Sequence, residues 1–193
     1  LFAMLGMLFP GMEPGPIVDE LRERVLEELD YHLEADNQRL FADAYRGHPY
    51  IHVPEVLEDL STSRVLTTEM AHGARFAEVT AWFDDERQLA AETLYRFVFG
   101  SIYSMGAFNG DPHPGNYLFR PGGQITFLDF GLVKRFNDRE VADFAEMIQL
   151  MVLDHDVAGY ARLLERIGIL AADNRFSDQQ IRDYFGHFYD FVM

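Results

Sequence analysis

Apolar residues recur at helical spacing over one long early stretch of the chain. Between residues 17 and 46 they form a single stripe, at Ile17, Leu21, Val25, Leu29, Leu33 and Leu40. A stripe with this period is typical of an amphipathic helix that packs against a core. Pro14 and Pro16 precede the stripe, and Gly47 and Pro49 follow it. Proline is tolerated at a helix start, and glycine or proline commonly ends one, so we expect one long helix here.

The pattern then changes to short runs that predict strands. Residues 51–57 and 64–70 are strand-like and are joined by a polar turn. Residues 117–119 and 124–128 are joined by Arg120-Pro-Gly-Gly123, which predicts a hairpin. Helices are predicted for the other apolar-periodic segments, at residues 84–105, 138–153, 155–167 and 177–192.

The candidate chemistry lies in Asp111-Pro-His-Pro-Gly-Asn116 and Asp129-Phe-Gly131. Asp111 and Asn116 are five residues apart, and Asp129 follows Asn116 by thirteen. A kinase catalytic loop supplies a carboxylate for the attacking group and an asparagine ligand for Mg²⁺, and a later Asp-Phe-Gly supplies another metal ligand. We therefore assign Asp111 as the catalytic carboxylate, Asn116 and Asp129 as metal ligands, and ATP with Mg²⁺ as cofactors.

The first of these motifs consists of turn-forming residues, so a plain surface loop is the alternative interpretation. The predicted hairpin argues against it, because it would hold the loop at one end and Asp129 at the other. His113, inside the loop, is predicted to hold the shape of the loop through hydrogen bonds and not to take a proton from substrate.

The order of elements around these motifs predicts an α+β, protein-kinase-like fold. Residues 17–72 would form part of an N-lobe, with the long helix and the strands up to the hinge. Residues 73–193 would form a mostly helical C-lobe, and residues 1–16 an apolar lead-in. At 193 residues the chain can bury one good core.

Two places in the N-lobe segment are candidates for nucleotide contacts. Glu34 lies on the long helix, where a kinase has a glutamate that pairs with the lysine on the α- and β-phosphates. From periodicity alone, a solvated acidic face is the simpler interpretation. Glu69 and Met70 end the second predicted strand, where the backbone of a kinase hinge would bind adenine.

Parts of a complete kinase site are not found in this sequence. Its one lysine, Lys134, follows Asp129, and no glycine-rich phosphate loop precedes the long helix. We therefore expect a fragment, which would be inactive by itself. Only about six residues separate Gly131 from the helix predicted at Asp138. Because a protein-substrate kinase has a longer activation segment, a small molecule, a lipid or bare ATP hydrolysis is favoured.

Composition excludes some classes of partner. The net charge of −16 works against binding nucleic acid or an anionic membrane through a basic patch. The chain has no cysteine, which excludes disulfides and thiolate metal sites. The apolar run at residues 1–9 is too short to span a bilayer.

Several blocks of this sequence resemble the UbiB/AarF family of atypical kinases, which is linked to ubiquinone and other isoprenoid-lipid pathways. In order along the chain they are Glu28-Leu-Asp-Tyr-His-Leu-Glu-Ala-Asp-Asn37, Val53-Pro-Glu-Val56, Leu60-Ser-Thr-Ser-Arg-Val-Leu66, Gly110-Asp-Pro-His-Pro-Gly-Asn116 and Leu128-Asp-Phe-Gly131. The resemblance implies that Glu34 is the partner of the strand lysine. It also implies that Glu28 and Asp30 are a regulatory Glu-x-Asp pair, which contacts a Lys-x-Gly-Gln segment.

The resemblance further implies an ATPase-like or kinase activity that supports isoprenoid-lipid metabolism. Isoprenoid lipids or lipid-biosynthesis proteins would be partners, and the protein would be cytoplasmic, at the inner face of a membrane with which it associates peripherally. Two alternatives stay open. One is a small-molecule phosphotransferase similar to the aminoglycoside and choline kinases, which share a His-Pro-Gly-Asn loop. The other is a pseudokinase scaffold that keeps the fold and binds a partner.

Overall fold

The structure, a computed structural model, describes residues 31–171 and 176–186. The predicted apolar lead-in, the first part of the long helix, and Glu28 and Asp30 therefore lie outside the described residues. The chain divides into two compact units. Unit 1 comprises residues 1–101 and 108–134, and unit 2 comprises residues 102–107 and 135–193. Both the predicted N-lobe segment and the catalytic loop belong to unit 1, and the lobe boundary after residue 72 stays a prediction.

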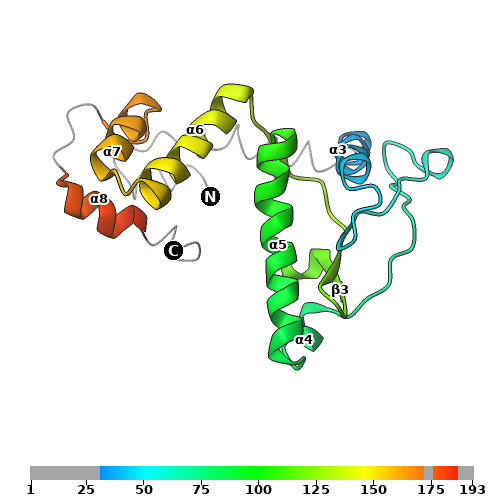
Figure 1. Cartoon of the computed structure of the whole chain (residues 1–193). Helices are drawn as coiled ribbons and strands as arrows, with labels where there is room; N and C mark the ends of the chain where they lie inside the picture. The colour runs from blue at the N-terminus through cyan, green and yellow to red at the C-terminus, as the bar shows by residue number, and fades with distance from the viewer. Residues whose placement is uncertain (1–30, 172–175, 187–193) are drawn as a thin grey trace, which may run out of the picture. The chain divides into compact units, whose positions relative to one another are not determined.

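Helix α3, Tyr31–Ala44, is the described part of the predicted long helix (Figure 1). Each buried residue of α3 has another three or four positions away, and the set is Ala35, Asn37, Gln38, Phe41 and Ala42. One face of α3 therefore packs on the core of unit 1. It is not the predicted apolar stripe, because Leu33 is exposed and Leu40 is only partly buried. Gln38, on the same face, donates from Nε2 to the Pro54 carbonyl at 2.6 Å.

A small sheet forms the centre of unit 1, with strand order β1-β4-β3. Strand β1 is Ile51–His52, β3 is Tyr117–Arg120 and β4 is Gln124–Phe127. Strands β3 and β4 are antiparallel, which confirms the predicted hairpin, and β1 runs parallel to β4. Gly122 and Gly123 turn the hairpin at φ +80° and +77°, a region in which glycine carries no steric penalty.

The two strands predicted at residues 51–57 and 64–70 are mostly absent. Only Ile51–His52 forms a strand, and the remainder is held by isolated antiparallel bridges, Val56↔Thr68 and Thr62↔Val65. Pro54 has no N–H to give to a ladder. The Ser61 hydroxyl donates to the Leu57 carbonyl at 2.9 Å, and such side-chain bonds compete with strand pairing.

Helix α5, Asp84–Met105, has the bounds that the sequence predicts. It is preceded by the short helix α4, Phe76–Val79. Strands β2, Ala107–Asn109, and β5, Val133–Arg135, pair in a two-stranded sheet. The sequence did not predict these two strands, because three residues are too few to establish an alternating pattern.

Unit 2 is helical. Helix α6, Asp138–Ile148, continues into a π-helical turn, Gln149–Leu153, and is followed by α7, Val157–Arg166, and α8, Asp178–Phe185. The three predicted helices are thus confirmed with shorter bounds, and the predicted end of the last one lies outside the described residues. The core of unit 2 consists of Met147, Met151, Val157, Tyr160, Leu163, Leu164 and Ile181.

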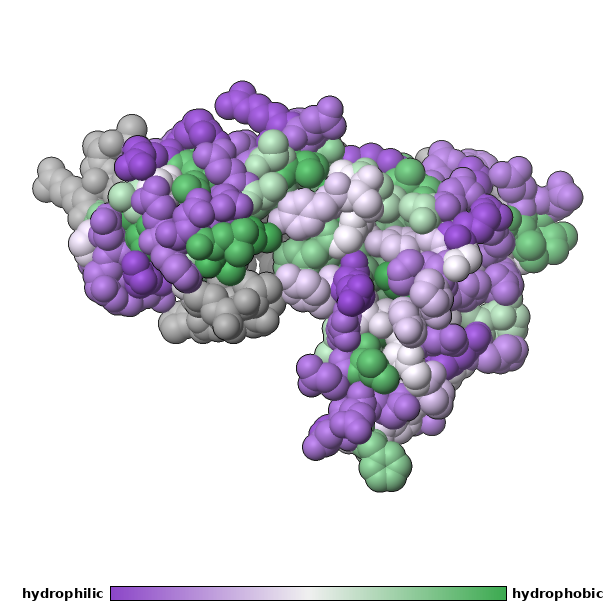
Figure 2. Space-filling model, viewed as in Figure 1, coloured by the Kyte–Doolittle hydropathy of each residue, from purple (hydrophilic) through white to green (hydrophobic). Residues whose placement is uncertain are grey.

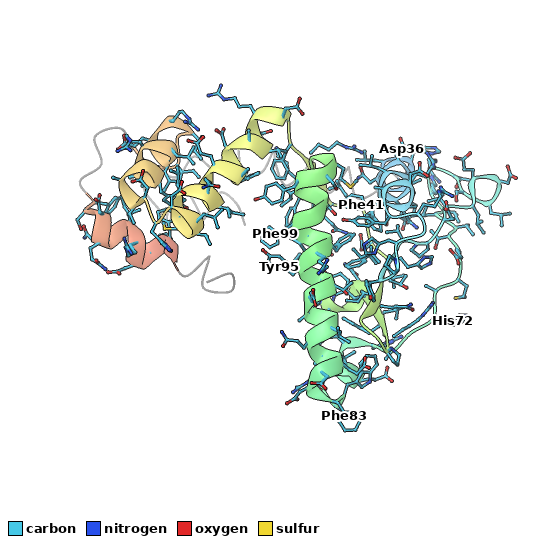
Figure 3. All side chains as sticks on the ribbon, in the orientation of Figure 1. Asp36, Phe41, His72, Phe83, Tyr95 and Phe99 are labelled. Atoms are coloured by element: carbon cyan, nitrogen blue, oxygen red, sulfur yellow. The ribbon has the colours of Figure 1, made fainter. Side chains whose placement is uncertain are left out.

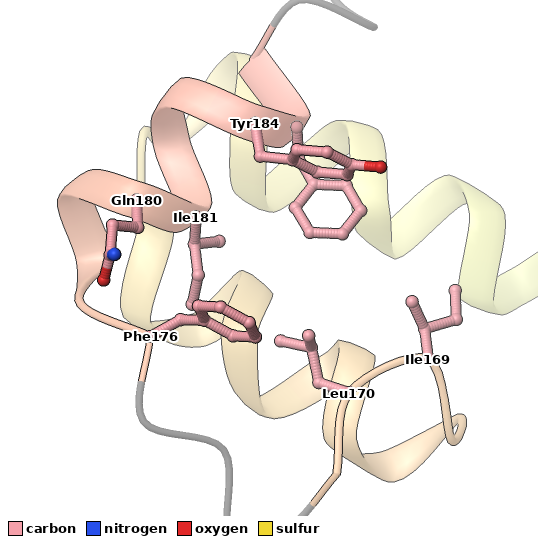
Figure 4. A pocket seen from close by; sticks show the side chains of 7 residues that line it. Ile169, Leu170, Phe176, Gln180, Ile181 and Tyr184 are labelled. Carbon is pink, nitrogen blue, oxygen red and sulfur yellow. The ribbon is translucent and has the colours of Figure 1, made fainter.

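Unit 2 also contains an apolar cavity of about 600 Å³, which Figure 4 shows from close by. It is lined by Ile169, Leu170, Phe176, Gln180, Ile181, Tyr184 and Phe185. Hydrophilic side chains predominate on the face seen in Figure 2, as the acidic composition implies. Tyr184 is the one titratable residue among the described residues that line this cavity.

Candidate functional site

The predicted catalytic-loop residues Asp111 and Asn116 are in contact. Asn116 Nδ2 donates to Asp111 Oδ2 at 2.9 Å. The 3-10 turn Pro114–Asn116 between them is held by His113, whose Nδ1 accepts from the Gly115 N–H at 3.0 Å and whose carbonyl accepts from the Asn116 N–H at 2.9 Å. These bonds confirm that His113 holds the shape of the loop.

Asp129 follows β4 and is brought to the loop by the hairpin. The Leu128 N–H donates to the Asn116 carbonyl at 3.0 Å, next to Asp129 in the chain. Asp129 Oδ1 accepts from the Gly131 N–H at 3.0 Å, which orients the carboxylate. The structure therefore places Asp111, Asn116 and Asp129 in one constellation within unit 1.

Helix α3 contributes the fourth predicted residue, Glu34. An added Cβ at Gly131 would lie 3.9 Å from Glu34 Oε2 and 3.4 Å from Asp129 Oδ1, so both carboxylates border the same glycine. One turn along the helix, the buried Asn37 donates from Nδ2 to the Phe130 carbonyl at 3.1 Å. Helix α3 thus fixes the backbone of the Asp-Phe-Gly segment.

The environment of Glu34 disfavours its charge. Burial raises the pKa of the Glu34 carboxyl above its ordinary 4.5, the nearby Asp129 carboxylate raises it further, and a hydrogen bond with the Phe130 backbone partly offsets both. Two carboxylates held this close favour a cation beside them, either a metal ion or a basic side chain.

Replacing Glu34 with Gln is expected to stabilise the 193-residue chain at pH 7.5. Because the pKa of Glu34 is raised in the folded state, the folded protein binds this proton more tightly than the unfolded chain does. The folded state therefore loses stability as the pH rises above 4.5. Gln carries no charge and so avoids this loss of stability, and it keeps an acceptor oxygen. We expect a gain of up to about 1 kcal/mol, since the half-exposed carboxyl is screened by solvent.

Urea unfolding of both proteins at pH 7.5 and pH 5 measures this difference. The gain is expected to shrink towards pH 5, and the exposed Asp59→Asn variant serves as a control for the loss of one carboxylate. A gain of equal size at both pH values would contradict the assignment to a perturbed carboxyl.

A polar cavity of about 480 Å³ lies between the predicted hinge and the catalytic loop. Its lining residues are Ala71, His72, Gly73, Arg75, Pro114, Gly115, Tyr117, Leu118 and Leu128. The volume is that of an ordinary small-molecule site. Gly73 is required here, since a Cβ would lie 2.8 Å from the Phe119 carbonyl oxygen. The close approach lets the next residue, Ala74, exchange two backbone hydrogen bonds with Phe119.

Glu69 and Met70, the predicted hinge contacts, flank this cavity and do not line it. The Glu69 N–H donates to the Glu55 carbonyl at 2.8 Å and is therefore not available to adenine. Met70 is 77% exposed. The backbone of the residues directly after them, beginning at Ala71, lines the cavity.

The donors present fit a magnesium site shared with a nucleotide. Because Asn116 uses Nδ2 for Asp111, its Oδ1 remains to face a metal, as does Oδ2 of Asp129. Within residues 31–171 and 176–186, no cluster of three His, Cys, Asp or Glu side chains could hold a metal ion. Mg²⁺ commonly takes one or two protein oxygens and completes its shell with phosphates and water, which this donor set allows.

Two asparagines near the site were not predicted to have a role. Asn37 ends the first block of the UbiB/AarF resemblance, and its bond to Phe130 joins residues 93 positions apart. Asn109 donates from Nδ2 to the Asp129 carbonyl at 2.7 Å, and its Oδ1 accepts from the Asp111 N–H at 3.2 Å. No spacing rule points to Asn109, and only its position two residues before Asp111 could have drawn attention to it.

Comparison with known proteins identifies the family. The model of the ABC1 atypical kinase-like domain matches residues 1–164. The chain belongs to the ABC1 atypical kinase-like family. Its relatives in Arabidopsis thaliana include the chloroplastic protein ACTIVITY OF BC1 COMPLEX KINASE 1, 32% identical over 86% of this chain and 25% of the relative. Another is a chloroplastic aarF domain-containing protein kinase, 31% identical over 80% of this chain and 21% of the relative.

A solved structure of similar fold comes from Mycobacterium tuberculosis. Rv3197, determined in complex with erythromycin, is 30% identical with a TM-score of 0.79, over 96% of this chain and 47% of that one. The ABC1 chain described here thus has the kinase-like α+β fold, with six α-helices and small sheets in its described part. It spans 25% and 21% of the length of the two Arabidopsis relatives named above. The predicted UbiB/AarF resemblance is confirmed.

Proposed function

We propose that the complete protein binds ATP with Mg²⁺ and hydrolyses it or transfers its γ-phosphoryl group. The observation that carries this proposal is the contact between the Asp111 and Asn116 side chains, with Asp129 held beside them by the hairpin. A plain surface loop has no need to gather two carboxylates and an amide oxygen. Family membership supports a kinase-type activity.

The roles of the residues follow from their surroundings. Asp111 would accept the proton of the attacking hydroxyl or water, and Asn116 and Asp129 would hold the metal ion. Bound Mg²⁺ would neutralise charge on the transferred phosphate. Burial, and secondarily the Asp111 carboxylate, raise the pKa of Tyr117, which keeps this hydroxyl protonated as a donor at the edge of the cavity.

The cavity beside the loop suits a nucleoside. Ala71, Leu118 and Leu128 give it apolar surface for a base, and the cationic Arg75 lines it as well, where it would attract an anionic ligand. Glu34 would pair with a basic group on the phosphates, since burial and the Asp129 carboxylate disfavour its charge unless a cation lies beside it.

The phosphoryl acceptor is proposed to be water or a small or lipid molecule. Strand β5 begins at Val133, two residues after Gly131, and α6 begins at Asp138, so little chain is left there for a peptide platform. A role in isoprenoid-lipid metabolism, with peripheral association at the cytoplasmic face of a membrane, rests on the UbiB/AarF resemblance. Within the described ranges, no helix is both long and apolar enough to cross a bilayer.

Calorimetric titration of ADP into the complete protein, with and without Mg²⁺, tests this function. Binding is expected to require the metal, and Asp129→Asn is expected to weaken it at least about tenfold, through loss of an anionic ligand to the metal. The exposed Asp59→Asn variant, with the same loss of charge, should bind as the wild type does.

The other outcomes separate the alternatives. Equal affinity of the wild type and Asp129→Asn would remove Asp129 from the metal site. Absence of binding in both would favour a scaffold. Phosphorylation of a soluble alcohol or an aminoglycoside by the purified protein would favour the small-molecule phosphotransferase.

A further inference from the structure

Asn109, the last residue of β2, uses both ends of its carboxamide. Its Nδ2 donates to the backbone carbonyl of Asp129 at 2.7 Å, and its Oδ1 accepts from the backbone N–H of Asp111 at 3.2 Å. The residue is 9% exposed, so water competes little for these bonds. One side chain thus joins the backbones of the two aspartates of the candidate site, which come from different segments of the chain.

We propose that Asn109 is a positioning residue that sets the distance between the Asp111 carboxylate and the Asp129 metal ligand. The inference rests on the proposed function. A carboxamide is planar, so its donor and acceptor cannot move independently. A shift of either aspartate backbone would break one of the two bonds, and the pair therefore keeps one relative placement.

The side chain is not required for the strand in which it lies. Strand β2 pairs with β5, and the next residue, Gly110, donates its backbone N–H to the Leu132 carbonyl at 2.8 Å. The chain would therefore follow the same course with another side chain of similar size at position 109. Among side chains of this size, only Asn supplies a donor and an acceptor in one rigid group.

Two replacements separate the donor from the acceptor. Asn109→Asp has the same shape and keeps an oxygen for the Asp111 N–H, but turns a second oxygen towards the Asp129 carbonyl. Asn109→Leu has a similar size and loses both bonds. Gln38→Leu is the matched control, because Gln38 is fully buried and its carboxamide donates at 2.6 Å to the carbonyl of Pro54, which lies outside the two segments that Asn109 joins.

Hydrogen exchange of the complete protein without nucleotide is the first readout. Asn109→Leu is expected to speed exchange in peptides covering residues 107–112 and 128–131. Asn109→Asp is expected to do so mainly in the second peptide, since the bond to Asp111 is kept. Gln38→Leu should leave both unchanged. Unaltered exchange in Asn109→Leu would overturn the proposal.

Steady-state ATP hydrolysis is the second readout. Misplacement of a reacting group by about 1 Å can cost about 10²-fold in rate, so both Asn109 variants are expected to lower kcat by about 10–10²-fold. The KM for ATP should change by less than about threefold, because no contact with the nucleotide is lost. An equal fall in kcat for Gln38→Leu would show a merely structural role and overturn the proposal.

The two readouts keep this inference apart from the proposed function. If the wild type neither binds nor hydrolyses ATP, the proposed function fails, and the exchange experiment still decides whether Asn109 fixes the two aspartates. If ATP is hydrolysed and the Asn109 variants match the wild type in kcat and in exchange, the function stands and the positioning role of Asn109 is wrong.

Discussion

Asp111→Asn is expected to lower the ATP turnover of the complete protein by about 10²–10⁴-fold, the usual range for loss of a general base. The carboxylate accepts a proton only during the reaction, so the affinity for ADP with Mg²⁺ should change by less than about threefold. The loop should keep its shape, because an amide oxygen at position 111 can still accept the bond that Asn116 Nδ2 now donates at 2.9 Å. Phosphate release and calorimetry measure the two quantities.

The exposed Asp59→Asn variant controls for the general loss of one negative charge and should turn over as the wild type does. Turnover of Asp111→Asn within about twofold of wild type would show that Asp111 takes no proton in the reaction. A parallel loss of ADP binding would instead place Asp111 among the metal ligands, which would change the division of roles between it and Asp129.

The parts of the fold that the sequence predicts correctly are those whose signal is local. Helix α5 is twenty-two residues long and contains no proline, and the hairpin has a two-glycine turn between short apolar runs. The prediction of strands at residues 51–57 and 64–70 was mostly wrong, because the pairing of these segments depends on groups outside them. The Pro54 carbonyl is taken by Gln38, which lies on α3. Alternation alone does not reveal such competition.

The candidate site likewise has a part that the sequence predicts and a part that it does not. The hairpin made it possible to predict that Asp111, Asn116 and Asp129 would meet, because the turn returns the chain to the loop. The contacts of Asn37 and Asn109 are made with backbone groups of Asp129 and Phe130. Any residue at those positions has a carbonyl, so the sequence carries no complementary side chain from which such contacts could be predicted.

Phe41→Ala is expected to have the largest effect on stability, about 3–5 kcal/mol, the usual cost of removing a fully buried aromatic ring. Phe41 is labelled in Figure 3. Its ring lies 5.5 Å from that of Phe97 on α5 and 5.0 Å from that of Phe130 in the Asp-Phe-Gly segment. Phe97 in turn stacks on Phe127 of β4, with ring centroids 3.6 Å apart. Truncation of Phe41 would leave a cavity among α3, α5 and the hairpin.

This aromatic cluster connects stability with the site, since Phe130 is held by its ring as well as by its backbone. Without the Phe41 ring, Phe130 gains freedom to move, and the adjacent Asp129 is expected to bind the metal less firmly. Urea unfolding should therefore show the loss of stability of Phe41→Ala, and ADP titration its weaker metal-dependent binding. The control is Phe83→Ala, whose ring is 86% exposed and which should change stability by less than about 0.5 kcal/mol. A Phe41→Ala protein that loses stability but keeps the wild-type requirement and affinity for Mg²⁺ would show that the backbone bonds alone position Asp129.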